Sequence, residues 1–319
     1  MLELKVPIAY DEQQNLISPE RAQKGAAYFC PACGASLVFR QGEVKVPHFA
    51  HRLSETCNQE TIIHKIAKLL VQKAVTDWKA GLAAAPILKR KCQICRSHVE
   101  QPLPDKVDTA VVETRLPNGF IADVALIVSG KPEAAIEIKV SHKVDEVKAR
   151  RLSIPFLELD GVTVIEDSHS WEPTRDGFKP VTCTRCSRNV QTFQAKVAEI
   201  AQRSGVELPT SYYRYAWHVC WKCQKEIVVF TWPGQGMHAE KPPRQQPIPK
   251  TLRYEFSKTV GAKYWVNTCP YCRAIQGDFF LYSEPEGPFF GFRCGRDTPE
   301  AFRQDLMLIA AHVDYFGML

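Results

Sequence analysis

The stretch AAIEIKVSH, residues 134–142, places a carboxylate and an ammonium group inside an apolar run. Side chains along a strand alternate between its two faces. Ile136 and Ile138 therefore share one aliphatic face, whereas Glu137 and Lys139 share the other. A polar face of this kind either meets water or lines a site, so Glu137 and Lys139 are candidates for chemistry.

A third candidate is Asp123, in the stretch IADVAL on the strand predicted just before this one. We expect neighbouring strands to bring Asp123 close to Glu137. Two carboxylates so placed can hold Mg²⁺ or Mn²⁺, with water completing the octahedron. Lys139 could then orient the attacking water or stabilise negative charge on a phosphate. The alternative is a structural ion-pair patch formed by the same three residues.

The segment 58–80 is predicted to be a helix because its apolar residues recur at helical spacing. Glu60, His64 and Lys68 follow one another at intervals of four, so they share one face away from the aliphatic side. Glu60 could support the metal, with His64 nearby. The alternative is a solvated helix face. Weaker candidates, expected beside the site or on the surface, are Glu113, Ser141 and Arg151.

Ten of the 12 cysteines fall in five C-x2-C pairs. In a reducing cytosol disulfides are rare, and such pairs indicate zinc. Thioredoxin-like redox chemistry or unpaired thiols are the alternative, but the presence of five pairs favours zinc. The pairs are Cys30/Cys33, Cys92/Cys95, Cys183/Cys186, Cys220/Cys223 and Cys269/Cys272.

The last two pairs predict a zinc ribbon. Cys220 and Cys223 precede one strand-like run, and Cys269 and Cys272 precede another. A C-x2-C pair that binds zinc is called a zinc knuckle. Two knuckles on two hairpins supply four thiolates, which form the closed shell of a structural zinc site.

Elimination pairs Cys92 and Cys95 with Cys183 and Cys186. These four residues bracket the predicted mixed sheet, and a zinc ion there would tie the ends of that domain together.

The N-terminal knuckle, Cys30 and Cys33, has three possible partners. We favour His51 and Cys57 as the third and fourth ligands, with His48 as the rival of His51. About three zinc ions are therefore expected per chain. Cys294 has no evident partner and is interpreted as a buried thiol.

The elements that must carry the acidic residues form a predicted mixed sheet over residues 107–160. The turn PNG joins its first two strands. A short helix precedes the last strand, so a crossover should pair the last two strands in parallel. The predicted strands span 107–116, 120–128, 134–141 and 154–159, and the short helix spans 144–152.

Three domains are predicted. Residues 1–57 form an N-terminal zinc-binding module, residues 58–187 the mixed-sheet domain bracketed by the second zinc site, and residues 188–319 a helix followed by the zinc ribbon. Further helices are expected at 188–204 and 298–316.

The net charge of +6 and the pI near 8.6 are compatible with nucleic acid as a partner. No apolar run approaches the roughly 20 residues that span a bilayer. The N-terminal stretch MLELKVPIAYDEQQ lacks the basic region and apolar core of a secretory signal. We therefore expect a cytoplasmic protein without membrane association.

The spacing D-x13-E-x-K of Asp123, Glu137 and Lys139 resembles the PD-(D/E)xK nuclease superfamily, with Ala122 in place of the motif's proline. The resemblance implies a restriction-endonuclease-like mixed sheet. Together with the N-terminal zinc module and the C-terminal zinc ribbon predicted from the cysteine pairs, the expected fold class is α+β or α/β. The resemblance also implies phosphodiester hydrolysis with Mg²⁺ or Mn²⁺.

The chain also resembles CoiA-like competence proteins over roughly residues 20–165. The knuckle CPACG, the stretch PHFAH, the helix ETIIHKIAKLL and the D…E-x-K-x-S strand pair carry this resemblance. It implies an endo- or exodeoxyribonuclease acting on DNA in competence, recombination or related processing. The extra knuckles through residues 183–294 depart from the family and suggest a branch with its own partner or substrate.

Two other functions compete with a nuclease. One is a catalytically silent nucleic-acid-binding protein or scaffold, against which the intact Asp123, Glu137 and Lys139 argue. The other is an RNA-binding ribbon, suggested by the aromatic stretch TSYYRYAWHVCW with Arg214. Aromatic residues beside a zinc knuckle more often form its small hydrophobic core.

Overall fold

The computed structural model describes residues 3–42, 46–52, 57–140, 154–209, 213–232, 242, 247–284 and 287–289 of the chain. The chain divides into two compact units, Met1–Val181 and Thr182–Leu319. Within its described part, no helix combines the length and the apolar character that crossing a membrane requires. Outside the described residues lie the predicted helices at 144–152 and 298–316, together with Ser141, Arg151 and Cys294.

The first unit begins with a small sheet in the order β1-β6-β5-β4-β2-β3, whose paired strands run antiparallel. The rings of Tyr28, Phe39 and Phe49 pack together at its centre, with centroids 4.8 to 5.9 Å apart. The strands are β1 (Glu3–Val6), β2 (Ala9–Tyr10), β3 (Leu16–Ile17), β4 (Tyr28–Phe29), β5 (Ser36–Arg40) and β6 (His48–Arg52), with a 3-10 turn η1 (Pro19–Arg21).

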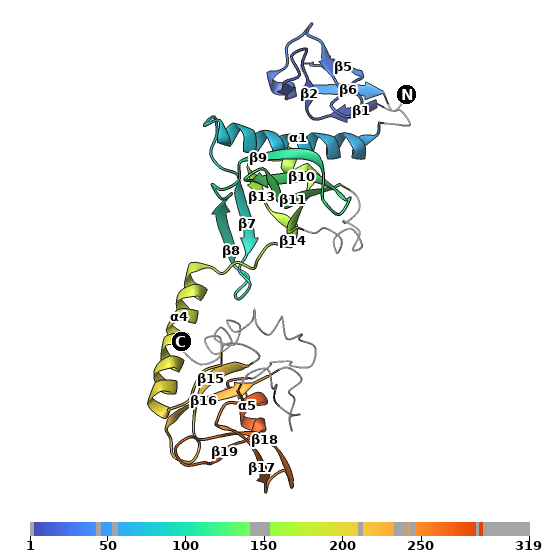
Figure 1. The fold of residues 1–319 in the computed structure, drawn as a ribbon. Helices are drawn as coiled ribbons and strands as arrows, with labels where there is room; N and C mark the ends of the chain where they lie inside the picture. The colour runs from blue at the N-terminus through green and yellow to red at the C-terminus, as the bar shows by residue number, and fades with distance from the viewer. Residues whose placement is uncertain are drawn as a thin grey trace. The chain divides into compact units, whose positions relative to one another are not determined.

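The helix α1 (Gln59–Lys79) serves two hydrophobic cores. Asn58 caps it, because its side-chain oxygen accepts a hydrogen bond from a main-chain N–H of the first turn at 3.0 Å. Ile62 and Ile66 pack into the core of the N-terminal sheet, whereas Val71 packs into the core of the next sheet. Figure 1 shows the helix running between the N-terminal sheet and β9.

The central sheet has the order β14-β12-β11-β10-β9. A turn containing Gly119, at φ +85°, joins the antiparallel strands β9 and β10, which confirms the predicted hairpin. Strand β11 pairs antiparallel with β10 and parallel with β12, which confirms the predicted parallel pairing of the last two strands. The strands are β9 (Thr109–Arg115), β10 (Ile121–Val128), β11 (Lys131–Lys139), β12 (Phe156–Asp160) and β14 (Pro173–Asp176).

Apolar residues of one face of this sheet form a core with α1. Val124, Ile136 and Leu157 come from three adjacent strands, and all three are fully buried. Trp171, from a smaller sheet of order β13-β7-β8, is buried in the same core. The remaining elements of this unit are β7 (Ile87–Lys91), β8 (His98–Pro102), β13 (Ser170–Trp171) and α3 (Gly161–Glu166).

The second unit opens with α4 (Thr184–Ser204). The sulfur of Cys183 accepts a hydrogen bond from the Cys186 N–H at 3.5 Å and caps the helix. The helix therefore starts four residues before the predicted position 188, and it ends at Gly205, which is left-handed at φ +63°.

Two antiparallel sheets follow, β15-β16 and β17-β18-β19. Asn267 joins them, because its side chain accepts from the Phe230 N–H at 2.7 Å and donates to the Phe230 carbonyl at 2.9 Å. Tyr213 and Arg214 are buried, so this part of the predicted aromatic cluster belongs to the core. The elements are β15 (Arg214–Val219), β16 (Glu226–Thr231), β17 (Leu252–Ser257), β18 (Ala262–Thr268), β19 (Ile275–Gln276) and α5 (Asp278–Tyr282).

Candidate functional site

Four of the five C-x2-C pairs form the same turn. The N–H of the residue after the second cysteine donates to the carbonyl of the first cysteine, at 2.8 to 3.0 Å. That residue is left-handed, with φ between +58° and +74°. The turn is a zinc knuckle, because it leaves both sulfur atoms of a pair within 4.8 Å of each other. The left-handed residues are Gly34, Arg96, Gln224 and Arg273.

The N-terminal knuckle meets His51 and Cys57, as favoured from the sequence. The Cys30 and Cys57 sulfur atoms lie 3.8 Å apart, and Cys33 Sγ lies 3.0 Å from His51 Nε2. The rival, His48, places Nδ1 3.0 Å from the Val46 carbonyl oxygen instead. Sulfur atoms around a tetrahedral zinc ion lie about 3.8 Å apart, so this group could hold zinc.

The thiols of this group differ in acidity. Burial raises the pKa of Cys33, but hydrogen bonds led by that with His51 bring it down to about 7. Burial raises the pKa of Cys57 to about 12. Bound zinc requires both sulfur atoms as thiolates, so metal binding at this group would release protons.

The ribbon group joins the two C-terminal knuckles as predicted. The Cys220 and Cys272 sulfur atoms lie 3.7 Å apart, and those of Cys223 and Cys269 lie 3.6 Å apart. These separations also match a tetrahedral zinc ion with four thiolates. The third predicted group has its ligand atoms within 4.8 Å of one another and could hold zinc as well; it comprises Cys92, Cys95, Cys183 and Cys186.

The acidic candidates lie on the central sheet, where Asp123 and Glu137 meet. The Asp123 N–H donates to Glu137 Oε1 at 3.3 Å, and Asp123 Oδ2 accepts from the Ile138 N–H at 2.9 Å. Glu137 is fully buried, whereas Asp123 keeps 13% of its side chain exposed. Lys139 ends β11 two residues beyond Glu137 and is half-buried.

The helix α1 brings two cationic or ionisable groups to Asp123. His64 Nε2 lies 3.1 Å from Asp123 Oδ2, and Lys68 Nζ lies 3.7 Å from Asp123 Oδ1. Lys68 is buried, so the interpretation of this helix face as solvated is wrong at that residue. Glu60 is exposed and lies one helical turn before His64.

Glu113 contacts the same helix and has an unusual backbone conformation. Its φ of +52° is rare for a residue with a side chain. Glu113 Oε1 accepts hydrogen bonds from Lys65 and Lys68, each at 3.1 Å. The neighbouring Val112 packs against the core that α1 shares. Two consecutive residues of β9 therefore face α1, and Glu113 links the sheet to the lysine that contacts Asp123.

A carboxylate that the sequence reasoning missed stands opposite Glu137. Glu158 on β12 is its partner in the parallel register, and both residues are buried. The Thr174 hydroxyl donates to Glu158 Oε1 at 2.6 Å. The available signal was a glutamate between Leu157 and Leu159, the same pattern that identified Glu137.

Each metal-binding group found in the described part of the chain consists of cysteines, in one case with a histidine, and Asp123 and Glu137 form no such group. The hydrogen bond between these two residues joins the Asp123 main-chain N–H to the Glu137 carboxylate, and the Asp123 carboxylate itself accepts from the Ile138 N–H. The geometry therefore supports zinc at the cysteine groups more directly than Mg²⁺ at the carboxylates.

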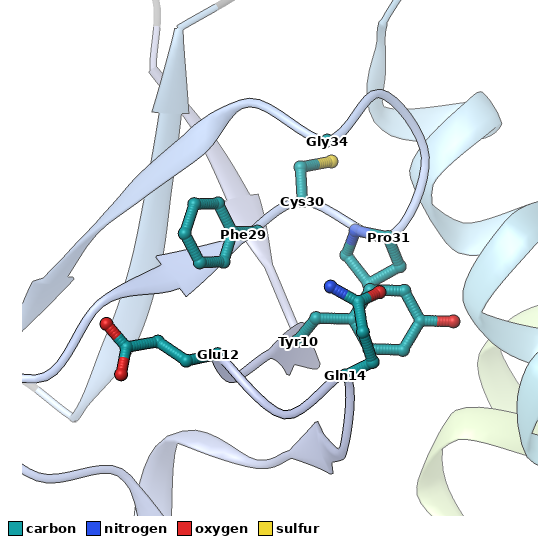
Figure 2. A pocket seen from close by; sticks show the side chains of 7 residues that line it. All are labelled: Tyr10, Glu12, Gln14, Phe29, Cys30, Pro31 and Gly34. Carbon is teal, nitrogen blue, oxygen red and sulfur yellow. The ribbon is translucent and has the colours of Figure 1, made fainter.

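A cavity of about 570 Å³ lies beside the N-terminal knuckle. Figure 2 shows the Tyr10 and Phe29 rings on its wall, with the side chain of Gln14 alongside Tyr10. Cys30 and Gly34 also line it, so the cavity belongs to the zinc module and not to the sheet that carries the carboxylates.

Comparison with known proteins assigns the N-terminal part of the chain. Residues 12–60 match the N-terminal domain of competence protein CoiA. Competence protein CoiA of Bacillus subtilis (strain 168) is 30% identical over 77 residues, which are 24% of this chain and 21% of that relative. No solved structure matches the chain. This N-terminal segment is therefore CoiA-like, and the match covers the three cysteines and the histidine of its candidate zinc group and the first two residues of α1.

Proposed function

We propose that the chain is a divalent-metal-dependent nuclease that acts on DNA, with Asp123, Glu137 and Lys139 as its site. The observation that carries the proposal is the meeting of Asp123 and Glu137 on adjacent strands, joined by a hydrogen bond of 3.3 Å. The strand directions of the central sheet also agree with the PD-(D/E)xK resemblance.

The surroundings of Glu137 give a physical reason for a cation. Glu137 and Glu158 are direct neighbours on parallel strands, and both are buried. Two ionised carboxylates at such a position repel each other in a medium that screens charge weakly. A bound cation would relieve that repulsion.

The residues of the site would divide the work of phosphodiester hydrolysis. Asp123 and Glu137 would hold Mg²⁺ or Mn²⁺, which supplies a Lewis acid for the phosphate and for the attacking water. Lys139 would orient that water or stabilise the charge that develops on the phosphate. His64 would position the Asp123 carboxylate, which it contacts at 3.1 Å. Glu60 would support the metal from the adjacent helical turn.

The CoiA relative carries competence in its name, and we propose DNA processing in competence, recombination or a related cytoplasmic pathway for this chain. The similar segment spans about a fifth of that relative. The proposed activity therefore rests on the site itself.

A second function, a silent nucleic-acid-binding protein, is favoured by the partners of Asp123. His64, Lys68 and the Ile138 N–H all engage its carboxylate. A carboxylate held in this way can act as a structural ion pair, so an activity measurement must separate the two functions.

The test is cleavage of single-stranded, duplex and branched DNA with Mg²⁺ or Mn²⁺. We expect Asp123→Ala and Glu137→Ala to abolish cleavage, because both remove a metal ligand. Lys139→Ala should slow cleavage by about 10²-fold or more, because it removes charge stabilisation in the transition state. Glu133→Ala is the matched control, because Glu133 is an exposed glutamate on the same strand, and it should cut like wild type.

Melting curves and zinc content check that each variant stays folded. Equal cleavage by wild type and Glu137→Ala would show that the proposed site is wrong. Absence of cleavage by wild type on every DNA substrate, with retained DNA binding, would favour the silent protein.

A further inference from the structure

The tip of the zinc ribbon carries exposed aromatic and basic side chains. We define the ribbon tip as five residues on the two knuckles that the ribbon cysteines bring together. Trp221 keeps 62% of its surface exposed and Tyr271 keeps 37%. Three exposed cations accompany them. The ribbon tip comprises Trp221, Lys222, Lys225, Tyr271 and Arg273.

The knuckle turn does not require these aromatic residues. The other two knuckles have the same hydrogen bonds and left-handed residue, yet their sequences are CPAC and CQIC, whereas the ribbon knuckles read CWKC and CPYC. Zinc binding and turn formation therefore leave these positions free to vary. The aromatic side chains also contribute little to the core, because both remain exposed.

A hydrogen bond fixes the Trp221 ring, and both rings keep part of their surface open. The Trp221 indole N–H donates to the Ile275 carbonyl at 2.8 Å, which fixes the ring at the edge of β19. Lys225 Nζ lies 4.4 Å from the centre of the Tyr271 ring. Fixed aromatic rings lose little conformational entropy when a flat partner stacks on them.

The charge of the ribbon tip suits a polyanion. Residues 220–225 and 269–274 contain three lysines or arginines and no acidic residue. The nearest acidic residue in sequence, Glu226, is already paired with Lys196 and Arg203 at 3.1 and 2.9 Å. Part of the positive charge offsets the thiolates around zinc, but that role does not explain the aromatic rings.

We infer that the ribbon tip binds single-stranded DNA, with bases stacking on Trp221 and Tyr271 and phosphates facing Lys222 and Arg273. Stacking on aromatic side chains together with cations along the backbone is how proteins hold single strands without reading their sequence. The choice of DNA over RNA rests on the proposed function. The binding surface itself is independent of the carboxylate site.

The test is the binding of a fluorescein-labelled oligothymidylate to the full-length, zinc-loaded chain, followed by anisotropy without added Mg²⁺. Loss of one stacking partner weakens such binding about 5- to 150-fold, so we expect Trp221→Ala to raise the dissociation constant at least fivefold. Lys222→Gln should reduce the slope of log affinity against log salt by about 0.7.

Matched controls lie at the far end of the β17-β18 hairpin. Phe256 is 53% exposed and pairs with Lys263 near the turn of that hairpin. Trp221 donates its hydrogen bond to Ile275, which pairs with Thr268 at the opposite end of β18. Phe256→Ala should therefore bind like wild type, and Lys258→Gln should keep the wild-type salt slope. Unchanged zinc content in every variant excludes loss of the fold.

Three results would overturn the inference: no binding of the oligothymidylate, equal weakening by Trp221→Ala and Phe256→Ala, or clearly tighter binding of an RNA of the same length. The Glu137→Ala variant separates this inference from the proposed nuclease. If Glu137→Ala binds the oligothymidylate like wild type, and neither wild type nor any variant cuts DNA, the inference about the ribbon tip is supported and the proposed nuclease is refuted. If wild type cuts and Trp221→Ala binds normally, only the ribbon tip fails.

Discussion

Gly34 closes the N-terminal knuckle with a left-handed backbone, at φ +74°. A Cβ atom added there would meet nothing within 4 Å, so alanine would strain the backbone without a clash. The left-handed conformation costs other residues about 1–2 kcal/mol. Replacing glycine also lowers the entropy of the unfolded chain, which stabilises the fold by about 0.4–1 kcal/mol. We therefore expect Gly34→Ala to destabilise the module by about 1 kcal/mol.

Hydrogen exchange measures this loss locally, which suits a chain with two compact units. The Cys30 and Gly34 N–H groups hold the turn, and each donates to a carbonyl at 2.8 Å. Where local opening and closing are fast, 1 kcal/mol of destabilisation accelerates exchange about fivefold. We expect a peptide covering residues 28–40 to exchange about five times faster in zinc-loaded Gly34→Ala than in wild type.

Gly42 supplies the matched control for this experiment. It lies in the same unit, has no left-handed φ, and an added Cβ atom would also meet nothing within 4 Å. Gly42→Ala should leave exchange unchanged or slow it slightly, because only the entropy of the unfolded chain changes. Equal acceleration by both variants, or no acceleration by Gly34→Ala, would refute the assignment of strain to the Gly34 backbone.

Two further predictions concern metal and pH. Elemental analysis of protein purified without added zinc should give about three zinc ions per chain, and about two after Cys57→Ala; one or none in wild type would contradict the cysteine groups. Hydrogen bonds from Lys65 and Lys68 lower the pKa of Glu113 from its ordinary 4.5, so this carboxylate stabilises the fold above pH 4.5 and loses that contribution as the pH falls below it. The contribution should be under about 1 kcal/mol because half of the side chain is exposed, and Glu113→Gln should remove it from the acid branch of a stability-against-pH curve; identical acid branches would refute the role.

The cysteine groups could be predicted from sequence because a C-x2-C pair encodes its own turn. Spacing alone does not decide whether His48 or His51 is the third ligand of the N-terminal zinc group, but the alternation of side chains along a strand does. Phe49 is buried, and His51 shares its face of β6, whereas His48 lies on the opposite face. The strand that carries Glu137 was likewise predicted from alternation.

Two features of the carboxylate site depend on packing that the local sequence does not encode. Lys68 follows the polar spacing of a solvated helix face, yet it is buried because Asp123 and Glu113 lie within its reach across the sheet. The left-handed backbone of Glu113 occurs within a run of strand-forming residues, where no glycine or asparagine signals it. Both features arise where α1 packs against the sheet, and neither hydrophobic periodicity nor motif spacing predicts the contacts made there.

The helix α1 has a consequence for how this chain can be divided into fragments. The CoiA match ends at residue 60, two residues into α1. The core of the matched segment, however, is completed by Ile62 and Ile66, which lie beyond that boundary on a helix anchored to the central sheet. The matched domain is thus smaller than the segment that folds. A fragment cut at residue 60 would expose an unfinished core, so the N-terminal module should be expressed and unfolded together with the sheet that bears Asp123 and Glu137.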